Sequence, residues 1–317
     1  MSKDKLLFWA KKYTILIIMA VFFLIFSIST KGFLSKSNLM NILLQQSPIG
    51  VMCVAATFVI INGYRDLSVG MAMGLSACLT VGLQEKLGVF GMLVALLACA
   101  IIGIINGFLV AKLEINSFIA TLAMMLGTRS ITYMYTNEMV QTGKLLWFAE
   151  FGAGELLGVP NLIWVFLSCV IIGELVLRNT LHGRLTYAVG GNPEAAKNAG
   201  INVLRTTMIN FVVVSLGGAL GGILTAARMN AGLPELGWPN THFLVIVMVV
   251  LGGTKLSGGY GNVLYTLGGV ITYGMIQNFL TLNNVHTFLT QMLTGVILIL
   301  VLCMDKVLQP TLQKRGK

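Results

Sequence analysis

Charged side chains are scarce in this sequence: only 10% of its 317 residues are Asp, Glu, Lys or Arg, whereas 56% are hydrophobic. With a mean hydropathy of +0.86, the chain is predicted to be a polytopic membrane protein. Acidic side chains are the rarer of the charged ones, at 11 against 21 Lys and Arg. The basic excess forms no stripe with interleaved aromatic residues, which excludes a nucleic-acid partner.

Residues that perform catalysis or bind metals are also few. The five cysteines lie singly in apolar segments, without the spacing of a zinc site, so we expect neither a metal nor a disulfide framework. The three histidines are far apart, no Ser or Cys has a base beside it, and no carboxylates pair at helical spacing, so no catalytic residues are predicted. The phosphate-binding G-x-x-x-x-G-K-[ST] loop is missing too. Although residues 256–259 read LSGG, we therefore expect no ATP or other cofactor on this chain.

Long apolar stretches are abundant. Ten of them are long enough to cross about 30 Å of hydrocarbon, and the first follows a basic start without a cleavage site, so it is predicted to be an uncleaved span. We predict a single all-α integral membrane domain over residues 1–317, a bundle of about ten transmembrane helices with broken or re-entrant segments. The predicted spans are 13–30, 39–61, 67–83, 88–110, 117–136, 161–178, 206–228, 241–254, 262–282 and 286–304.

The distribution of Lys and Arg predicts the orientation of these spans. If the N-terminus is cytoplasmic, fifteen cations fall in inside segments and five in outside segments, with Arg129 within a span. This bias places both termini in the cytoplasm by the positive-inside rule. It also places the polar stretch 179–205 in the cytoplasm, where it can couple the spans to a soluble partner.

A short helix is predicted within that stretch, over residues 192–200. Asn192 can cap its first turn, Pro193 suits the first helical position, and Gly200 can supply the left-handed residue that ends the helix after about two turns. A helix this short is unstable alone, so we expect a partner to dock on it, and its small alanines allow close approach. The predicted docking residues are Asn192, Pro193, Glu194, Ala195, Ala196 and Gly200.

Two polar, glycine-containing segments interrupt apolar runs, at 62–70 and 252–261. Irregular backbone in a membrane must be buried in protein or line a wet cavity. The first segment is therefore either a broken helix beside the solute path, where Asn62, Asp66 and Ser68 offer hydrogen bonds, or a cytoplasmic turn in which Ser68 or Asp66 caps the next helix. The two segments share a Gly, Leu-Ser, Gly pattern, which hints at a duplicated helix-break-helix unit in one orientation.

Polar side chains inside the predicted spans are further candidates for the solute path. Arg129 lies about 18 Å along its span from Ser117, and an unpaired arginine at the bilayer centre costs roughly 2.5–3.5 kcal/mol. The Arg129 side chain must therefore extend toward the membrane surface, pair with another residue or face water. Its role is either functional or structural. Gln277 and Asn278 either contact solute or join helices by hydrogen bonds. The predicted path residues are Asn62, Asp66, Ser68, Arg129, Gln277 and Asn278.

Short motifs also follow one another along the chain in a specific order. They are DLSVG at 66–70, GIING at 103–107, VAK at 110–112, FIATL at 118–122, GGNPEAA at 190–196, GINV at 200–203, LGGT at 251–254 and GGYG at 258–261. Together they resemble the membrane permease of ABC importers of the ribose and simple-sugar type, over about residues 39–305. In such importers a cytoplasmic Glu-Ala-Ala-x-x-x-Gly segment docks on the ATPase, and Glu194, Ala195, Ala196 and Gly200 match that segment.

The resemblance implies a permease for a monosaccharide or similar small polar solute, in the bacterial plasma (inner) membrane. Its implied partners are a second permease subunit, separate ABC ATPase subunits that bind ATP, an extracytoplasmic sugar-binding protein and membrane lipid. Two departures leave the solute open: Tyr64-Arg65 replaces the family's Gly-Ile, and His242 and Leu244 stand where the family usually has Glu and Asp. The alternative is a stand-alone secondary transporter, although scarce intramembrane carboxylates argue against proton coupling.

Overall fold

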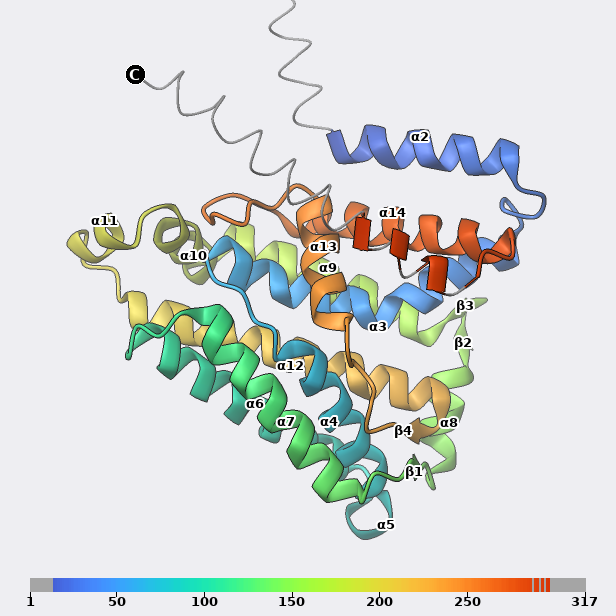
Figure 1. Cartoon of the computed structure of the whole chain (residues 1–317), viewed down its shortest axis with the longest axis horizontal. Coiled ribbons are helices and arrows are strands. Elements are labelled where there is room, and N and C mark those ends of the chain that lie inside the picture. Colours follow the sequence, from blue (N-terminus) through green and yellow to red (C-terminus); the bar gives the residue numbers. More distant parts are fainter. Residues whose placement is uncertain (1–13, 287, 291, 294, 297–317) are drawn as a thin grey trace, which may run out of the picture.

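The computed structural model describes residues 14–286, 288–290, 292–293 and 295–296. Helices form nearly all of its regular structure, which agrees with the predicted all-α class (Figure 1). The helices are α2 (Thr14–Ser29), α3 (Lys36–Ile61), α4 (Val69–Gly82), α5 (Gln84–Leu87), α6 (Phe90–Ala111), α7 (Ser117–Thr136), α8 (Leu146–Ala153), α9 (Asn161–Asn179), α10 (Leu181–Gly191), α11 (Pro193–Asn198), α12 (Val203–Met229), α13 (Thr241–Leu251) and α14 (Val263–Leu282). The strands are β1 (Gln141–Thr142), β2 (Glu155–Leu156), β3 (Val159–Pro160) and β4 (Ala231–Gly232).

The predicted spans correspond to helices wherever the structure describes them. Helices α3, α6, α9 and α12 are long and apolar enough to cross a membrane by length and composition, whereas α2, α4 and α13 are shorter apolar helices. Helices α7 and α14 coincide with the predicted spans 117–136 and 262–282. The tenth predicted span, 286–304, lies largely outside the described residues, as do both termini.

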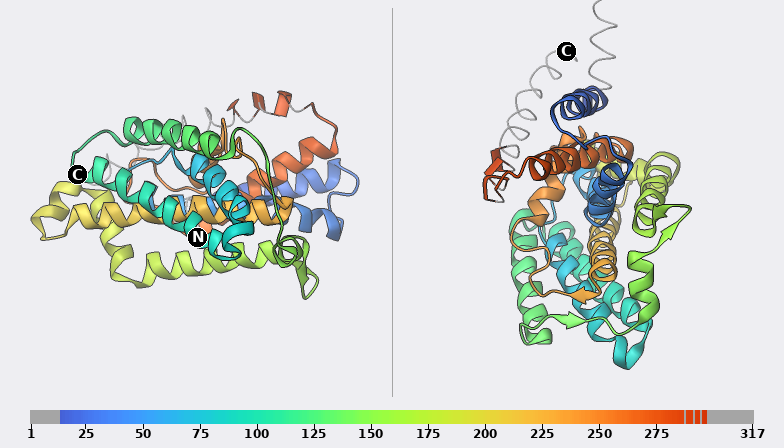
Figure 2. Two further views of the ribbon diagram at one scale, coloured as in Figure 1. Left: turned by 90° about the horizontal axis from the view of Figure 1, so that it is seen from below. Right: turned by 90° about the vertical axis from the view of Figure 1, so that its right-hand side faces the viewer.

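Helix α12 forms the centre of the bundle and packs against α3, α4 and α6. Figure 2 shows it running along the molecule between α9 on one side and α7 on the other. Glycines permit this packing, because a Cβ at Gly217 would overlap Ala55 of α3 and a Cβ at Gly222 would overlap the Met73 carbonyl of α4. The missing side chains at these glycines thus let the helix backbones approach closely.

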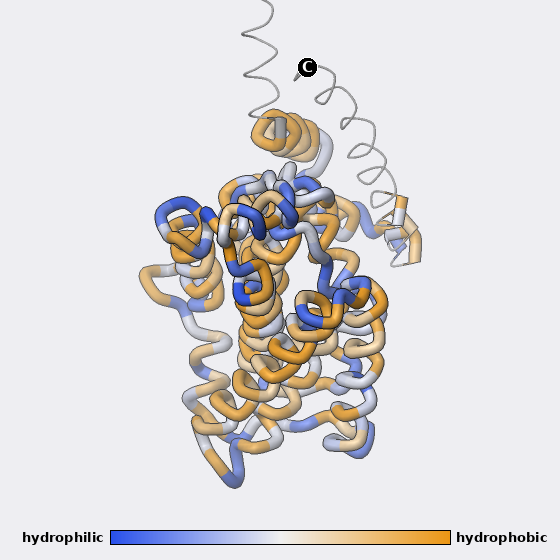
Figure 3. The backbone as a smooth tube through the Cα atoms, turned by 90° about the vertical axis from the view of Figure 1, so that its left-hand side faces the viewer, coloured by the Kyte–Doolittle hydropathy of each residue, from blue (hydrophilic) through white to orange (hydrophobic). Residues whose placement is uncertain are grey.

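The two ends of the bundle differ in structure. Helices α10 and α11 lie at one end, and α5, α8 and the short strands lie at the other (Figure 1). At the strand end β1 pairs antiparallel with β4, and β2 pairs antiparallel with β3. Seen from the α10–α11 end, hydrophilic residues gather in the near loops and short helices, while the helices behind them are mostly hydrophobic (Figure 3).

The chain between β4 and α13 leaves the helical pattern. Residues 233–240 run without regular helix beside α4, where the Gly237 carbonyl lies 3.0 Å from the position of a Cβ on Gly70. The 11 residues of α13 extend only about 16 Å at 1.5 Å per residue, roughly half of the 30 Å hydrocarbon layer. The helix thus begins where the span 241–254 was predicted and ends three residues earlier, and the irregular segment 233–240 precedes it.

Candidate functional site

The predicted short helix is present as α11, at the tip of the α10–α11 end. The Asn192 side chain accepts a hydrogen bond of 2.9 Å from the Ala195 N–H, and Pro193 occupies the first helical position. Gly200 has φ +81°, and the following Ile201 N–H donates to the Ala196 carbonyl at 3.0 Å, which ends the helix. The sequence prediction of this helix and of both its boundaries is confirmed.

One face of α11 is fixed to the protein and the other is exposed. Ala196 is buried, at 4% exposure, where α11 lies beside α10 and α12. Pro193, Glu194, Ala195 and Lys197 are exposed. This leaves a small-residue surface with a carboxylate at the positive helix end, open to a partner.

A junction of glycine backbones joins α10 to the rest of the bundle just before α11. The Gly259 N–H donates to the Ile61 carbonyl, the last in α3, at 2.8 Å. Gly190 of α10 packs on the same carbonyl, and a Cβ there would overlap it and lie 2.8 Å from the Gly259 nitrogen. A Cβ on Gly258 would lie 2.8 Å from the Gly63 Cα. We call Ile61, Gly63, Gly190, Gly258 and Gly259 the glycine junction.

The two predicted interruptions of the apolar runs meet at this glycine junction. Arg65 donates from its guanidinium to the Leu256 carbonyl at 3.2 Å, so the 62–68 and 252–262 connections are tied together directly. The Tyr187 hydroxyl of α10 donates to the Gly261 carbonyl at 2.7 Å. Helix α10 therefore contacts the connections of two helix pairs, α3 with α4 and α13 with α14.

The polar side chains of the first interruption point into the protein. Asn62 donates to the Thr207 hydroxyl of α12 at 2.9 Å, and Asp66 accepts from the Ser68 N–H and hydroxyl at 2.7 and 2.6 Å. The Ser68 hydroxyl in turn accepts from Asn106 of α6 at 2.9 Å. Asn62, Asp66 and Ser68 are all buried. They stabilise an irregular turn at the start of α4, which favours the turn interpretation with Asp66 as its capping side chain.

Asp66 has an unusual environment for a carboxylate. Among the described residues, no cation lies within ion-pair distance of it, and its second oxygen is buried without a hydrogen-bond partner. Burial raises the pKa of Asp66 to about 6, although its hydrogen bonds with Ser68 act in the opposite direction.

Arg129 of α7 belongs to a second polar cluster, between α7 and segment 233–240. Its guanidinium lies 4.0 Å from the centroid of the Trp238 ring and contacts the Tyr133 hydroxyl at 3.5 Å. Tyr133 donates to the Glu235 carboxylate at 3.0 Å. We call Arg129, Tyr133, Glu235 and Trp238 the arginine cluster. Arg129 is thus paired with the face of an aromatic ring and with a hydroxyl, and pairing was one of the three alternatives that the sequence left open for it.

The irregular segment 233–240 contributes half of the arginine cluster, and the sequence analysis missed it. The signal was present in the chain, because Pro234, Gly237 and Pro239 all oppose a helix just before the predicted span at 241–254. The apolar run that follows concealed it.

Gln277 and Asn278 join helices in this structure. Asn278 of α14 exchanges two amide hydrogen bonds with Asn38 of α3, at 2.8 and 3.0 Å. Gln277 accepts from Gln46 of α3 at 3.2 Å. Of the six predicted path residues, the structure thus brings Asn62, Asp66 and Ser68 together in one turn, and it places Arg129 and the Gln277–Asn278 pair elsewhere.

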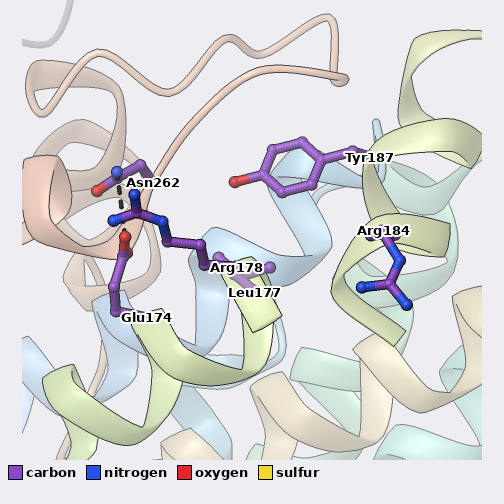
Figure 4. A pocket seen from close by; sticks show the side chains of 6 residues that line it. All are labelled: Glu174, Leu177, Arg178, Arg184, Tyr187 and Asn262. Atoms are coloured by element: carbon purple, nitrogen blue, oxygen red, sulfur yellow. Dashed lines mark hydrogen bonds between the residues drawn. The ribbon is translucent and has the colours of Figure 1, made fainter. Parts of the chain in front are cut away.

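A cavity of about 310 Å³ lies beside the glycine junction, between the end of α9, α10 and the start of α14 (Figure 4). The Glu174 carboxylate at its edge accepts from the Asn262 side chain at 3.3 Å and from the Val263 N–H at 3.2 Å. Glu174 therefore caps the N-terminus of α14 instead of forming an ion pair. The remaining lining residues are Leu177, Arg178, Arg184 and Tyr187.

The four helices that are long and apolar enough to cross a membrane are the features of an integral membrane protein. Residues 38–302 match the family of permease components of branched-chain amino acid transport systems, and the chain belongs to this family. It is 35% identical to the ribose import permease RbsC of Escherichia coli over 304 residues, which cover 94% of each chain. It is 34% identical to the L-arabinose transport permease AraH of Escherichia coli, over 93% of this chain and 90% of that protein. It is 36% identical to RbsC of Bacillus subtilis, over 89% of each. No solved structure matches.

Proposed function

We propose that this chain is the membrane subunit of an ATP-driven importer of a monosaccharide, in the bacterial inner membrane. Relatives that match most of the chain are import permeases for ribose and arabinose, so a pentose or a sugar of similar size is the expected solute. ATP would bind to separate ATPase subunits, and an extracytoplasmic binding protein would deliver the sugar to a pair of permease subunits.

The observation that carries this proposal is the exposed face of α11. This helix comes directly after α10, which contributes Gly190 to the glycine junction. An ATPase that grips Glu194 and Ala195 moves a helix too short to act independently. That motion passes through α10 to Gly190, and from there to the carbonyl end of α3 and the N–H of Gly259. Closure of the ATPase pair would thus shift both helix pairs that meet at the junction, as alternating access requires.

The arginine cluster is the proposed point of contact with sugar. Segment 233–240 and the half-length helix α13 form the kind of discontinuous element that places binding groups within a membrane. Trp238 supplies a flat aromatic surface for a sugar ring, and Arg129, Tyr133 and Glu235 supply donors and acceptors for its hydroxyls. The buried Arg129 Nε has no hydrogen-bond partner among the described residues and can donate to a solute.

The test is reconstitution of the permease in lipid vesicles with its ATPase and sugar-binding protein. We expect ATP-dependent sugar uptake that E194K abolishes, because the substitution places a cation at the positive helix end and removes the docking carboxylate. The matched control is E114K, which reverses an exposed charge in the α6–α7 connection and leaves α11 unchanged.

Two results would contradict the proposal. Normal uptake by E194K would remove α11 from the coupling path. Uphill uptake by the permease alone, driven by an ion gradient, would instead identify a secondary transporter. Binding of E194K to the vesicle membrane in the usual amount would show that the variant inserts normally.

A further inference from the structure

The cavity beside α9 is lined by two arginines whose side chains have no partner among the described residues. Among the described residues, the only ion pair joins Lys144 and Glu85, at the opposite end of the bundle. Neither the Arg178 nor the Arg184 side chain makes a hydrogen bond or an ion pair with a described residue. Arg178 extends toward Asn262 and Glu174, and Arg184 lies on the other side of Tyr187 (Figure 4).

The charge of this cavity is not balanced by its own residues. Two arginines and one glutamate leave a net charge of +1 on the lining. Glu174 already accepts two hydrogen bonds from the start of α14, and Tyr187 already donates to the Gly261 carbonyl. The free donors of the cavity are therefore the two guanidinium groups, which suit the oxygens of a phosphate.

The apolar surface that leads to the cavity belongs to a membrane-crossing helix. Ile171, Leu175 and Arg178 follow the i, i+4, i+7 spacing of one face of α9. Ile171 is 60% exposed and Leu175 is 52% exposed, so this face is open to lipid tails as far as the arginine. An acyl chain along it would bring its headgroup to Arg178, at the level where the apolar helix ends.

We propose that this cavity binds the headgroup phosphate of an anionic phospholipid, with Arg178 and Arg184 as its two cationic contacts. The volume of about 310 Å³ is at the small end of the roughly 300–1,000 Å³ typical of ligand sites, which suits a headgroup whose tails remain outside. The net charge of +1 favours a lipid of charge −1 over a zwitterionic lipid. Tyr187 of the site donates to the carbonyl of Gly261, two residues after Gly259 of the glycine junction, so the bound lipid would brace α10 against α9 and α14.

The test uses the full-length permease, purified and titrated with phosphatidylglycerol or phosphatidylethanolamine while bound lipid is counted by native mass spectrometry. We expect preferential binding of phosphatidylglycerol and a loss of roughly 30-fold in its affinity in R178Q/R184Q, since each cation near an anionic lipid contributes about fivefold. The matched control K112Q/K197Q removes two exposed cations from the same end of the molecule. It should retain the preference.

Three outcomes would overturn the proposal. The first is an equal preference for phosphatidylglycerol in R178Q/R184Q and in the unmodified protein. The second is an equal loss in the K112Q/K197Q control, which would indicate a diffuse surface charge. The third is displacement of the lipid by excess inorganic phosphate, which would identify a site for a soluble anion. If R178Q/R184Q fails to fold, two measurements replace it. R178K/R184K keeps both charges, and a salt titration of the unmodified protein measures whether its affinity for phosphatidylglycerol falls as salt is added, as it must at a charged site.

Discussion

The glycine junction and the arginine cluster are both irregular, but different contacts hold them. At the glycine junction backbone touches backbone: Gly190 lies on the Ile61 carbonyl, which also accepts from the Gly259 N–H at 2.8 Å. In the arginine cluster, side chains hold segment 233–240, with the Arg129 guanidinium 4.0 Å from the Trp238 ring centroid. A contact between backbone atoms cannot be lost through a change of rotamer, so it is suited to transmit a displacement from one segment to the other. Side-chain contacts can be exchanged for those of a solute, which suits a place where sugar passes.

The largest effect is expected from a side chain at the glycine junction. In G190V the new Cβ overlaps the Ile61 carbonyl and approaches the Gly259 nitrogen, and both are backbone atoms that cannot rotate away. We expect loss of measurable sugar uptake in reconstituted vesicles and loss of sugar-stimulated ATP hydrolysis.

The neighbouring glycine provides the control. A Cβ on Gly191 would meet no atom within 4 Å, so G191A should transport at nearly the normal rate. If G190V and G191A were equally active, the glycine junction would not transmit motion. If both were equally inactive, the effect would come from the backbone of α10 in general.

An intermediate effect is expected in the arginine cluster. R129M keeps an unbranched apolar side chain as long as the stem of the arginine, but it removes the cation from the Trp238 ring and the contact with Tyr133. The interaction with the ring contributes about 0.5–2 kcal/mol, so we expect sugar uptake to fall roughly tenfold through a higher KM. Basal ATP hydrolysis should stay unchanged, because the docking helix is far from this cluster.

R129K sharpens the test, since lysine keeps the cation over Trp238 but loses the planar donors of the guanidinium. We expect R129K to lie between R129M and the unmodified protein in uptake at low sugar concentration. Equal kcat and KM in all three proteins would exclude sugar contact at Arg129. A loss of basal ATP hydrolysis in R129M would instead indicate a structural role.

The sequence predicted best the features that depend on local chemistry. Asn192, Pro193 and Gly200 fix both ends of α11 by capping and backbone preference, and the structure has the helix where they place it. These outcomes depend on nearest neighbours in the chain, which one sequence displays.

Features that depend on residues distant in the sequence could not be predicted in this way. Asn62 and Asp66 are polar residues beside an apolar run, and only the positions of α6 and α12 decide that they face inward. Trp238 belongs to the arginine cluster because segment 233–240 folds against α7, which is far away in sequence. Hydropathy averages over such a segment and merges it with the adjacent apolar run.

The smallest effect on sugar uptake is expected at Asp66, a side-chain contact in the 62–68 connection. Its pKa is raised from 3.8 to about 6 by burial, so between these values the folded protein retains a proton that the unfolded chain releases. Stability should therefore fall as pH rises from about 4 to 6, by roughly 3 kcal/mol in total, and remain level above that range.

D66N tests this dependence, because an amide oxygen can still accept from the Ser68 N–H and hydroxyl but cannot ionise. The thermal unfolding midpoint of the unmodified permease should fall between pH 4 and 6 relative to that of D66N, and the two curves should run parallel above pH 7. A difference between them that does not vary with pH would mean that the pKa of Asp66 is the same in the folded and the unfolded chain, as for a carboxylate in contact with water. In that case its hydrogen bonds, and not the cost of a buried charge, would set its contribution to the turn. Sugar uptake at neutral pH should be little changed in D66N, because the glycine junction beside it is held by backbone contacts that the substitution leaves in place.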